Sequence, residues 1–344
     1  MKKTGVSAYA AAGVNIDEKM AGIEAIKKMV KTTATSGVLT GIGSFGGMFR
    51  SPGKDRILVA STDGVGTKLK IATMAGRHDT VGQDIVNHCV NDILVQGATP
   101  LFFMDYIGTS KVDRGVMAEL VKGMCKACRE NACALLGGET AEMPGVYPPG
   151  EYDLVGTIVG SVAKNAVITG NAIRPGDAII GLPSTGLHTN GYSLARRIVF
   201  EKEGLTVKDR FPGTNRTVAD VLLAVHRSYL KPVTALMGKV PVRGLAHITG
   251  GGFPDNVPRV LPKGVTASFD RSAWKVPAVF AYLQEKGRVD REEMYRVFNM
   301  GIGMVIVVRE ADAAKAMAAL RACRAQPVRI GRMEKGNTPV RLDN

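Results

Sequence analysis

The sequence has few aromatic residues and no long apolar run. Aromatic residues make up 6% of the chain, and Trp274 is the one tryptophan. No apolar run reaches the roughly 18 residues that a membrane-spanning helix needs. The first residues, Met1–Gly5, lead into no apolar stretch of the kind found in secretory signals. We therefore expect neither a membrane span nor a secretory signal.

Several familiar catalytic motifs are also missing. The sequence contains no G-x-x-x-x-G-K-[S/T] phosphate loop, no H-E-x-x-H zinc motif and no G-x-S-x-G nucleophile motif. The string G-x-G-x-x-G occurs at residues 41–46, but a predicted helix (17–31) precedes it and a predicted strand (56–61) follows it. A dinucleotide-binding fingerprint has the reverse order, strand and then helix. We interpret residues 41–47 instead as a loop that could fold over phosphate groups.

Charge and cysteine content restrict the class of protein further. The net charge is +14, yet no run of five basic residues occurs and aromatic residues do not alternate with basic clusters. This pattern disfavours nucleic-acid binding and fits substrates that carry several phosphates. The five cysteines are an odd number, which indicates reduced thiols in the cytoplasm. Cys125-x-x-Cys128 lies in a predicted helix without a matching second pair, which favours structural cysteines over a zinc or redox site.

The order of apolar segments predicts two domains of mixed α+β class. Predicted strands and helices alternate in both halves, and a chain of 344 residues suits two domains of about 150 residues each. We place the boundary between residues 1–168 and 169–344, in a turn-rich junction. The predicted helices are 81–96, 112–131, 193–200, 218–230 and 311–323. The predicted strands are 56–61, 101–107, 134–137, 153–163, 178–182 and 303–308.

The segment Ser61–Lys68 is the first candidate for phosphate chemistry. A buried strand would fix the carboxylate of Asp63, and the glycines after it would expose backbone amides to phosphate oxygens. Thr62 and Thr67 add hydroxyls, and Lys68 adds a mobile positive charge. The alternative is an ordinary turn with a surface lysine.

Polar residues on the predicted helix 81–96 form a second candidate group. Asp84, His88, Asn91 and Asp92 share one side of that helix. Polar groups beside an apolar stripe need a partner if they are buried. Mg²⁺, a cap or a salt bridge would provide one. The alternative is a hydrated pair on the helix surface.

A third group of acidic residues lies in the first half. Gly137–Gly145 follows a predicted strand and holds Glu139 and Glu142, which would share a face in a helical turn. Asp105 ends an apolar strand. Together with Asp63 and Asp92 these carboxylates predict a Mg²⁺ site that bridges to phosphates.

The second half contributes glycine-rich segments that contain histidine. His188 lies in Ser184–Leu194, and His247 precedes three glycines. These two histidines are the better acid–base candidates. Glycine and amide groups before a predicted helix could hold an anion, although N-capping by Asn190 or Ser193 explains them equally. His78 and His226 have no motif around them, and we expect them at the surface or in caps.

Taken in order, these segments resemble the AIR synthetase (phosphoribosylformylglycinamidine cyclo-ligase) family. The resemblance covers the chain from about residue 5 to its end. It rests on Tyr9–Val14, Thr62–Lys68, Asn91–Asp92, Gln96–Phe103, Gly137–Gly145, His188–Ser193, His247–Gly252 and Asn299–Met304. Asn15 and Thr189 are small departures, where many members of the family carry Asp and Ser.

The resemblance implies an ATP- and Mg²⁺-dependent enzyme of purine biosynthesis. Such an enzyme converts formylglycinamidine ribonucleotide to aminoimidazole ribonucleotide, with release of ADP and phosphate. The resemblance also implies a homodimer in which the mixed sheets of the N-terminal domains pair, with active sites at the interface, while the C-terminal sheet is packed with helices.

The resemblance also assigns roles to particular residues. The implied Mg²⁺ ligands are Asp63, Asp92, Glu139 and, more weakly, Asp105. The implied catalytic residues are Asp63, Lys68, His188 and His247. The implied ATP-binding residues are Gly43, Gly46, Gly47, Thr62, Gly64, Gly66, Thr67, Lys68, Asn91, Gly138 and Thr140. The implied substrate-binding residues are His188, Asn190, Gly191, Thr249, Gly250 and Gly251.

Two kinds of alternative stay open at this point. One is another ATP-using enzyme of the same superfamily, such as thiamine-monophosphate kinase, selenophosphate synthetase or the amidotransferase of the preceding purine step. The amidotransferase is usually much longer, and selenophosphate synthetase is expected to carry an N-terminal reactive cysteine, whereas no cysteine precedes Cys89 here. The other alternative is a basic RNA-binding protein without enzymatic activity, for which salt-sensitive RNA binding without ATP turnover would argue.

Overall fold

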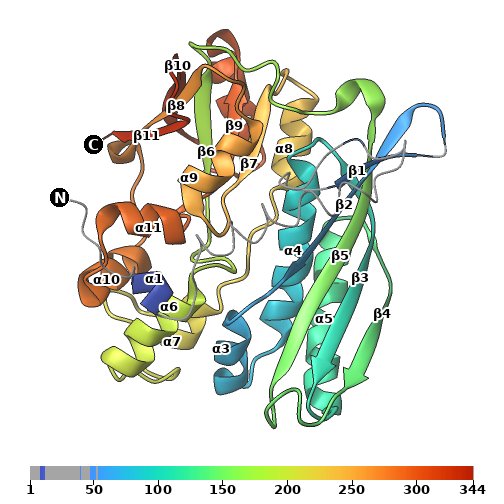
Figure 1. Ribbon diagram of the computed structural model, residues 1–344, viewed down its shortest axis with the longest axis vertical. Coiled ribbons are helices and arrows are strands. Elements are labelled where there is room, and N and C mark those ends of the chain that lie inside the picture. The colour runs from blue at the N-terminus through green and yellow to red at the C-terminus, as the bar shows by residue number, and fades with distance from the viewer. Residues whose placement is uncertain (1–7, 12–38, 40–46, 52, 344) are drawn as a thin grey trace.

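The computed structural model describes residues 8–11, 39, 47–51 and 53–343. A short helix, α1 (Ala8–Ala11), is the first described element. The predicted helix 17–31 and most of the 41–47 loop, including Gly43 and Gly46, lie outside the described residues. Two sheets follow, one in each half of the chain (Figure 1). The predicted boundary at residues 168 and 169 falls between the last strand of the first sheet and the first strand of the second.

The first sheet has five strands and mixed direction. In spatial order they are β1 (Gly47–Arg50), β2 (Arg56–Gly64), β5 (Tyr152–Ala163), β3 (Thr99–Thr109) and β4 (Ala134–Glu142). β3 and β4 run parallel, and the other pairs are antiparallel. Ile57 and Val59 on β2 are buried because alternate residues face the helices. The predicted mixed sheet is therefore confirmed.

Three helices pack on one face of this sheet: α3 (Lys68–Ala75), α4 (Asp79–Leu94) and α5 (Arg114–Glu130). Every residue of α4 from Thr80 to Leu94 is buried, because this helix lies between the first sheet and the C-terminal half. α4 and α5 meet closely at two glycines. A Cβ at Gly82 would lie 2.3 Å from the Leu120 carbonyl oxygen, so a larger residue would force the helices apart.

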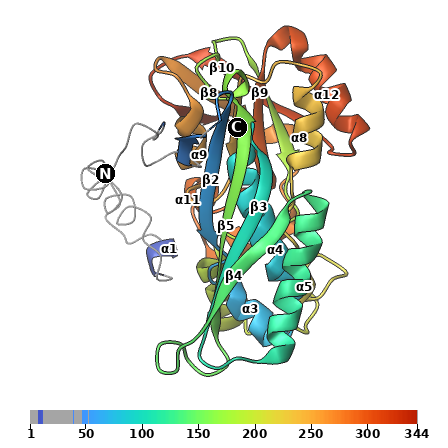
Figure 2. The same ribbon diagram turned by 90° about the vertical axis from the view of Figure 1, so that its right-hand side faces the viewer.

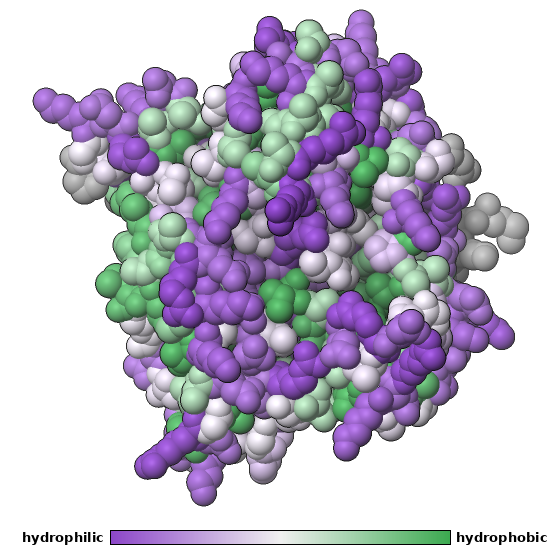
Figure 3. All heavy atoms as spheres, turned by 180° about the vertical axis from the view of Figure 1, so that it is seen from behind, coloured by the Kyte–Doolittle hydropathy of each residue, from purple (hydrophilic) through white to green (hydrophobic). Residues whose placement is uncertain are grey.

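The other face of the first sheet carries no described helix (Figure 2). Met104 and Leu136 are large apolar side chains on its strands, 43% and 62% exposed. Seen from behind, hydrophobic side chains gather along the edge of the molecule that this sheet forms (Figure 3). This surface is called the open face below.

The second sheet has six strands, again of mixed direction. Their spatial order is β11 (Val340–Asp343), β8 (Val265–Asp270), β10 (Val328–Lys335), β6 (Ala178–Pro183), β9 (Ile302–Val308) and β7 (Gly244–His247). β8 and β11 run parallel, and the remaining pairs are antiparallel. β6 and β9 are buried almost throughout, which explains their nearly continuous apolar sequences.

Short helices surround the second sheet. They are α6 (Tyr192–Arg196), which continues as a π-helix (Arg197–Lys202), α7 (Val218–Leu222), α8 (Leu230–Met237), α9 (Gly252–Asn256), α10 (Ala278–Gly287), α11 (Arg291–Val297) and α12 (Ala313–Ala322). Within residues 53–343, 3-10 turns lie at Lys164–Ala166, Val257–Val260, Arg271–Ala273 and Glu310–Asp312. None of the described helices is both long and apolar enough to span a membrane.

Two predicted elements are wrong in ways that affect the site. The predicted helix 218–230 ends at Leu222, and residues 224–229 have no regular structure. Asparagine side chains on α4 bind the backbone of residues 226–229, and that binding replaces helical hydrogen bonds. The predicted strand 134–137 continues to Glu142, so Glu139 and Glu142 lie on a strand rather than on one face of a helical turn.

Candidate active site

Four buried histidines meet between the two halves of the chain. His88 comes from α4, His188 follows β6, His226 lies in the irregular segment 224–229, and His247 ends β7. The ring centroids of His188 and His226 are 4.0 Å apart, and those of His88 and His247 are 5.2 Å apart. We call these four residues the histidine cluster.

Two carboxylates flank the histidine cluster. Asp63 stands near the end of β2, and its Oδ2 atom lies 2.9 Å from Nε2 of His88. Asp92, on α4, places Oδ2 3.6 Å from the same nitrogen and Oδ1 2.8 Å from Nδ1 of His247. The Asp63 side chain is 44% exposed, whereas that of Asp92 is 7% exposed. Asp63 is therefore the member of the group that solvent and ligands reach.

The surroundings give the four imidazoles different charges at neutral pH. Burial lowers the pKa of His88, but the negative charges of Asp63 and Asp92 outweigh it and raise the pKa to about 9. Burial lowers the pKa of His188 and of His226 well below the usual value, and neighbouring cations add to the effect. Burial also lowers the pKa of His247, against the pull of Asp92. One cationic and three neutral imidazoles are thus expected side by side.

Hydrogen bonds connect the two carboxylates through the cluster. Nδ1 of His88 lies 2.8 Å from the Thr189 hydroxyl, which is 3.4 Å from Nδ1 of His226. Nε2 of His226 is 3.0 Å from Nε2 of His247, and His247 reaches Asp92. Each link joins groups that can both give and accept a proton. The arrangement can therefore hold or transfer protons among four buried imidazoles, with Asp63 at the end that solvent reaches.

Lys68 does not supply the mobile charge that the sequence suggested. Its Nζ atom lies 2.6 Å from Oδ2 of Asp84, and both side chains are fully buried. The same ammonium group donates to the carbonyl oxygens of His188, at 3.1 Å, and Ala224, at 2.8 Å. Because those carbonyls belong to the C-terminal half, Lys68 connects the two halves beside the histidine cluster.

Asn91 is likewise occupied by the backbone of the segment 224–229. Its amide donates to the Arg227 carbonyl at 2.8 Å, and its oxygen accepts from the Tyr229 amide at 2.9 Å. Asn87, one turn earlier on α4, donates to the His226 carbonyl at 2.8 Å. The partner of these two asparagines is thus the backbone of residues 226–229, rather than the Mg²⁺, cap or salt bridge that the sequence suggested.

The glycine-rich loop after β7 is organised by one buried asparagine. The Asn256 amide donates to the carbonyls of Thr249, Gly250 and Gly252, at 3.3, 3.3 and 2.7 Å. Asn190 lies against this loop, since its Oδ1 would be 2.9 Å from a Cβ at Gly250. Gly251 has a φ of +94°. The loop and Asn190 therefore form one wall near His188 and His247.

Residues around the end of β2 contact the Asp63 carboxylate, the C-terminal half of the chain or the open face. The Gly64 amide donates to Oδ1 of Asp63 at 2.7 Å, and Gly66 adopts a φ of +69°. The Thr67 hydroxyl is 3.1 Å from that of Ser193 in the C-terminal half. Thr62 instead pairs with the Thr157 hydroxyl, at 2.8 Å, on the open face. Gly47 begins β1 at the edge of the same sheet.

The remaining predicted ligands lie further along the first sheet. Asp63 pairs with Gly156, which pairs with Asp105, which pairs with Gly138, so the two carboxylates share the helix-covered face two strands apart. Burial raises the pKa of Asp105.

Glu139 pairs with Tyr106 and therefore points to the open face, while Thr140 is the next residue along β4. Among the described residues of one chain, Glu139 does not join Asp63 and Asp92 in one ligand set.

Two members of the site escaped the sequence prediction. His226, expected at the surface or in a cap, is fully buried at the centre of the cluster. His78, which carried the same expectation, is the N-cap residue of α4, outside the cluster, and its ring is buried against Tyr152. Thr189 appeared only as a departure from a motif, yet it bridges His88 and His226. The apolar run Val221–Val225 before His226 was the available local sign of burial, because Val, Leu and Ala are among the residues most often buried.

Comparison with known proteins identifies the family. The model of the AIR synthase related protein N-terminal domain matches residues 14–162, and that of the C-terminal domain matches residues 174–343. A phosphoribosylformylglycinamidine cyclo-ligase from Trichlorobacter lovleyi is 52% identical over 88% of both chains. One from Burkholderia ambifaria is 52% identical over 94% of this chain and 92% of its own. This chain belongs to the phosphoribosylformylglycinamidine cyclo-ligase family.

Solved structures of proteins outside this family share the fold of this chain, and this likeness does not bear on activity. A thiamine-monophosphate kinase from Stenotrophomonas maltophilia superposes with a TM-score of 0.64 at 15% identity, over 92% of this chain and 94% of its own. A hydrogenase maturation protein HypE in complex with ATP gives a TM-score of 0.60 at 22% identity, over 83% and 78% of the two chains. Such low identities show a shared fold alone. The predicted membership of the cyclo-ligase family is thus confirmed against its superfamily rivals.

Proposed function

We propose that this protein catalyses the ATP-dependent cyclisation of formylglycinamidine ribonucleotide to 5-aminoimidazole ribonucleotide, releasing ADP and phosphate. The observation that carries the proposal is 52% identity, over most of both chains, to enzymes named for this reaction. The carboxylates and histidines between the two halves supply suitable chemistry.

The reaction needs activation of a poor electrophile. Transfer of the γ-phosphoryl group to the formamide oxygen turns that oxygen into a leaving group. The amidine nitrogen then attacks the formyl carbon of the same molecule, which gains from enforced proximity. Protons must leave the substrate as the imidazole ring forms. His188 and His247 are the proposed acceptors, because burial lowers the pKa of both and keeps the imidazoles neutral.

The carboxylates suit Mg²⁺, which the family implies. Asp63 and Asp92 both direct Oδ2 toward the cationic His88, so a positive charge already sits between them, and oxygen is the donor that Mg²⁺ prefers. We assign these two residues as the ligands, with Asp105 two strands away as a weaker member. When bound, Mg²⁺ would neutralise charge on the transferred phosphoryl group. Glu139 would have to reach the metal from a different direction.

ATP and the ribonucleotide substrate would bind to polar walls on opposite sides of the two carboxylates. Gly64, Gly66 and Thr67 follow Asp63 and would place backbone amides on the ATP phosphates, and Gly138 and Thr140 stay in that proposed group. Asn190, Gly191 and Thr249–Gly251 would hold the ribonucleotide substrate on the other side. Lys68 would act by fixing the His188 and Ala224 carbonyls.

The open face of the first sheet supports a homodimer. Phe49 and Met104 are 47% and 43% exposed on a sheet whose opposite face is covered by helices. An apolar sheet surface that none of the described elements covers is typical of an interface. We propose that two copies pair through it. A copy seated there would also lie near Glu139 and Thr62, which point to that face.

Product analysis tests the activity directly. The protein is mixed with ATP, Mg²⁺ and formylglycinamidine ribonucleotide, and both ADP and aminoimidazole ribonucleotide are quantified over time. We expect equal amounts of the two products and no ADP without the ribonucleotide. ADP release that ignores the substrate, or no product with it, would refute the proposal.

A further inference from the structure

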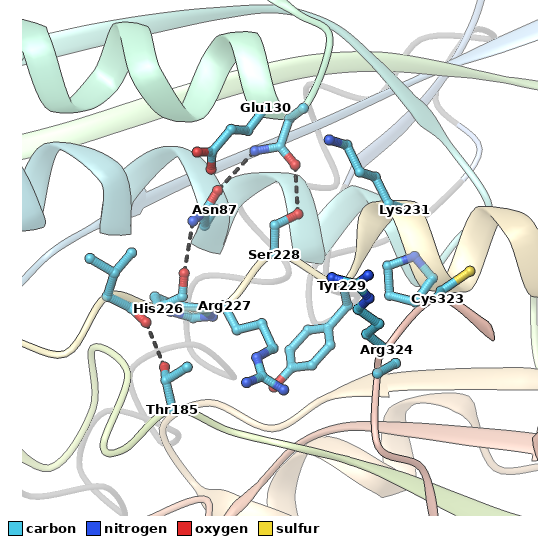
Figure 4. A pocket seen from close by; sticks show the side chains of 14 residues that line it. Asn87, Glu130, Thr185, His226, Arg227, Ser228, Tyr229, Lys231, Cys323 and Arg324 are labelled. Atoms are coloured by element: carbon cyan, nitrogen blue, oxygen red, sulfur yellow. Dashed lines mark hydrogen bonds between the residues drawn. The ribbon is translucent and has the colours of Figure 1, made fainter. Parts of the chain in front are cut away.

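A cavity of about 630 Å³ lies beside the segment 224–229, around the ends of three helices. Glu130 ends α5, Lys231 lies at the start of α8, and Arg324 follows α12. Figure 4 shows these side chains around the cavity with Arg227 and Tyr229 between them. Neither Asp63 nor Asp92 lines it, so the cavity is separate from the carboxylates of the candidate active site.

The lining of this cavity is strongly basic. Arg227, Lys231 and Arg324 contribute three cations, and Glu130 contributes one carboxylate. Among the described residues, no carboxylate forms a salt bridge with any of the three cations. Burial keeps the pKa of His226 well below its usual value, so that residue adds no charge. The net charge of about +2 around one concave space attracts an anion. The same charge offsets the cost of removing water from that anion as it enters.

The wall behind these cations is held by a chain of amide hydrogen bonds. The Ser228 hydroxyl donates to Oδ1 of Asn131 at 2.5 Å, and the Asn131 amide donates to Oδ1 of Asn87 at 2.8 Å. The amide of Asn87 then holds the His226 carbonyl. Asn87 and Asn131 are almost fully buried, at 4% and 2% exposure. The backbone that carries Arg227 is therefore fixed before any ligand arrives.

Arg227 is itself oriented by the protein. Its Nη1 atom donates to the Pro183 carbonyl at 3.2 Å, and within the described part of the chain the other guanidinium nitrogens donate to no further residue (Figure 4). A planar guanidinium placed in this way matches two oxygens of a phosphate group. Lys231 and Arg324 are exposed and can approach the same group from the rim.

We propose that this cavity binds an organic phosphate, a phosphorylated metabolite of about the size of a nucleoside monophosphate. Its volume falls in the usual range of small-molecule sites, which is about 300–1,000 Å³. The basic side chains would bind the phosphate, and the space beside Tyr229 would receive the organic part. Because the same segment carries the His226 ring, the occupant would lie against the backbone that positions one member of the histidine cluster.

Calorimetric titration of the full chain tests the site without any turnover. The probes are inorganic phosphate, ribose 5-phosphate and AMP, with adenosine as the uncharged match to AMP. All titrations contain saturating AMPPCP, so that the ATP site is filled. The test variant is Lys231→Gln/Arg324→Gln. The control is Lys239→Gln/Arg321→Gln, which removes the same charge from exposed positions of the same two helical regions outside the cavity.

We expect the phosphorylated probes to bind the natural sequence and the control alike, and to bind the test variant at least about tenfold more weakly, since charge-assisted hydrogen bonds are lost. Adenosine should bind far more weakly than AMP. Equal affinities in the test variant and the control, or adenosine binding as tight as that of AMP, would overturn the proposal. Since only binding is measured, failure here leaves the proposed cyclisation untouched.

Discussion

Nζ of Lys68 and Oδ2 of Asp84 lie 2.6 Å apart, and no part of either side chain is exposed. Burial lowers the pKa of Lys68 and raises that of Asp84, while their mutual attraction opposes both shifts. Lys68 also donates to the carbonyls of His188 and Ala224, and Asp84 also accepts a hydrogen bond from the His226 amide. It joins α3 and α4 to the C-terminal half.

We predict that Lys68→Met will destabilise the protein by about 3–5 kcal/mol, because it leaves the Asp84 carboxylate buried and unpaired. Urea unfolding followed by circular dichroism measures the change. The double variant Lys68→Met/Asp84→Asn should recover a substantial part of the loss. If the double variant loses as much stability as Lys68→Met and Asp84→Asn lose together when measured singly, the two residues do not act as a pair.

The pH dependence of stability should reveal the charged state of His88. In the folded protein Asp63 and Asp92 raise its pKa to about 9, above the unfolded value of about 6.5. The stabilisation from its charged form is thus complete below about pH 6.5 and is lost as the pH rises through about 9. Its upper limit is about 3 kcal/mol.

Urea unfolding at pH 6.5 and pH 9.5, in EDTA, tests this prediction by comparing the natural sequence with His88→Gln. We expect the variant to lose less stability over this interval than the natural sequence does. His78→Gln serves as the control, because burial lowers the pKa of His78 and its contribution has the opposite sign. Identical pH profiles for all three proteins would show that His88 is not charged by its two carboxylates.

Replacement of the exposed Asp63 carboxylate should lower turnover strongly and change stability little. We predict that Asp63→Asn will lower kcat/KM by about 10²–10³-fold, as loss of one electrostatic group in phosphoryl transfer does. ADP and aminoimidazole ribonucleotide formation are the readouts, with the melting temperature as the check on folding. Asp55→Asn is the control, since Asp55 is an exposed carboxylate just before the same strand. Normal turnover of the Asp63→Asn protein would remove this residue from the proposed Mg²⁺ ligands.

The sequence predicts this site in part, and the limits have physical causes. The site candidates Asp63, Asp92, His188 and His247 lie close together, because strand ends and one buried helix face place them at the junction of the two halves. His88, which the sequence showed only as a polar residue of the same helix as Asp92, joins them there.

The role of Lys68 could not be predicted, because its partners lie 16 and more than 100 residues away along the chain. His226 was missed for a similar reason, since its segment loses helical structure only through side chains of α4. Local sequence indicates which residues carry chemistry, whereas distant contacts decide which of them are exposed.

Gly191 is required by packing as well as by its backbone conformation. Its φ is +78°, and a Cβ at this position would lie 2.2 Å from Cε1 of Phe298. Gly204 has a similar φ of +65°, but a Cβ there would meet no atom within 4 Å. We predict that Gly191→Ala will cost about 1–3 kcal/mol more than Gly204→Ala, because the second change brings only the backbone strain that both share. Urea unfolding compares the two variants. Equal losses would show that Phe298 moves aside freely.

The open face provides the last prediction, which concerns assembly. Met104 stands on β3, the strand next to the edge strand β4 of that face, and the proposed dimer would bury it. Met104→Glu should therefore convert the dimer to a monomer, because pairing would bury two uncompensated carboxylates. Sedimentation velocity measures the mass.

Met74→Glu is the matched control, since Met74 is 50% exposed on α3, which packs on the opposite face of this sheet, and its replacement should leave the mass unchanged. A natural sequence that sediments as a monomer would refute the dimer outright. A Met104→Glu protein that stays dimeric would place the interface elsewhere on the molecule. If the partner also completes the site through Glu139, the Met104→Glu monomer should fold normally yet lose turnover, which separates assembly from stability.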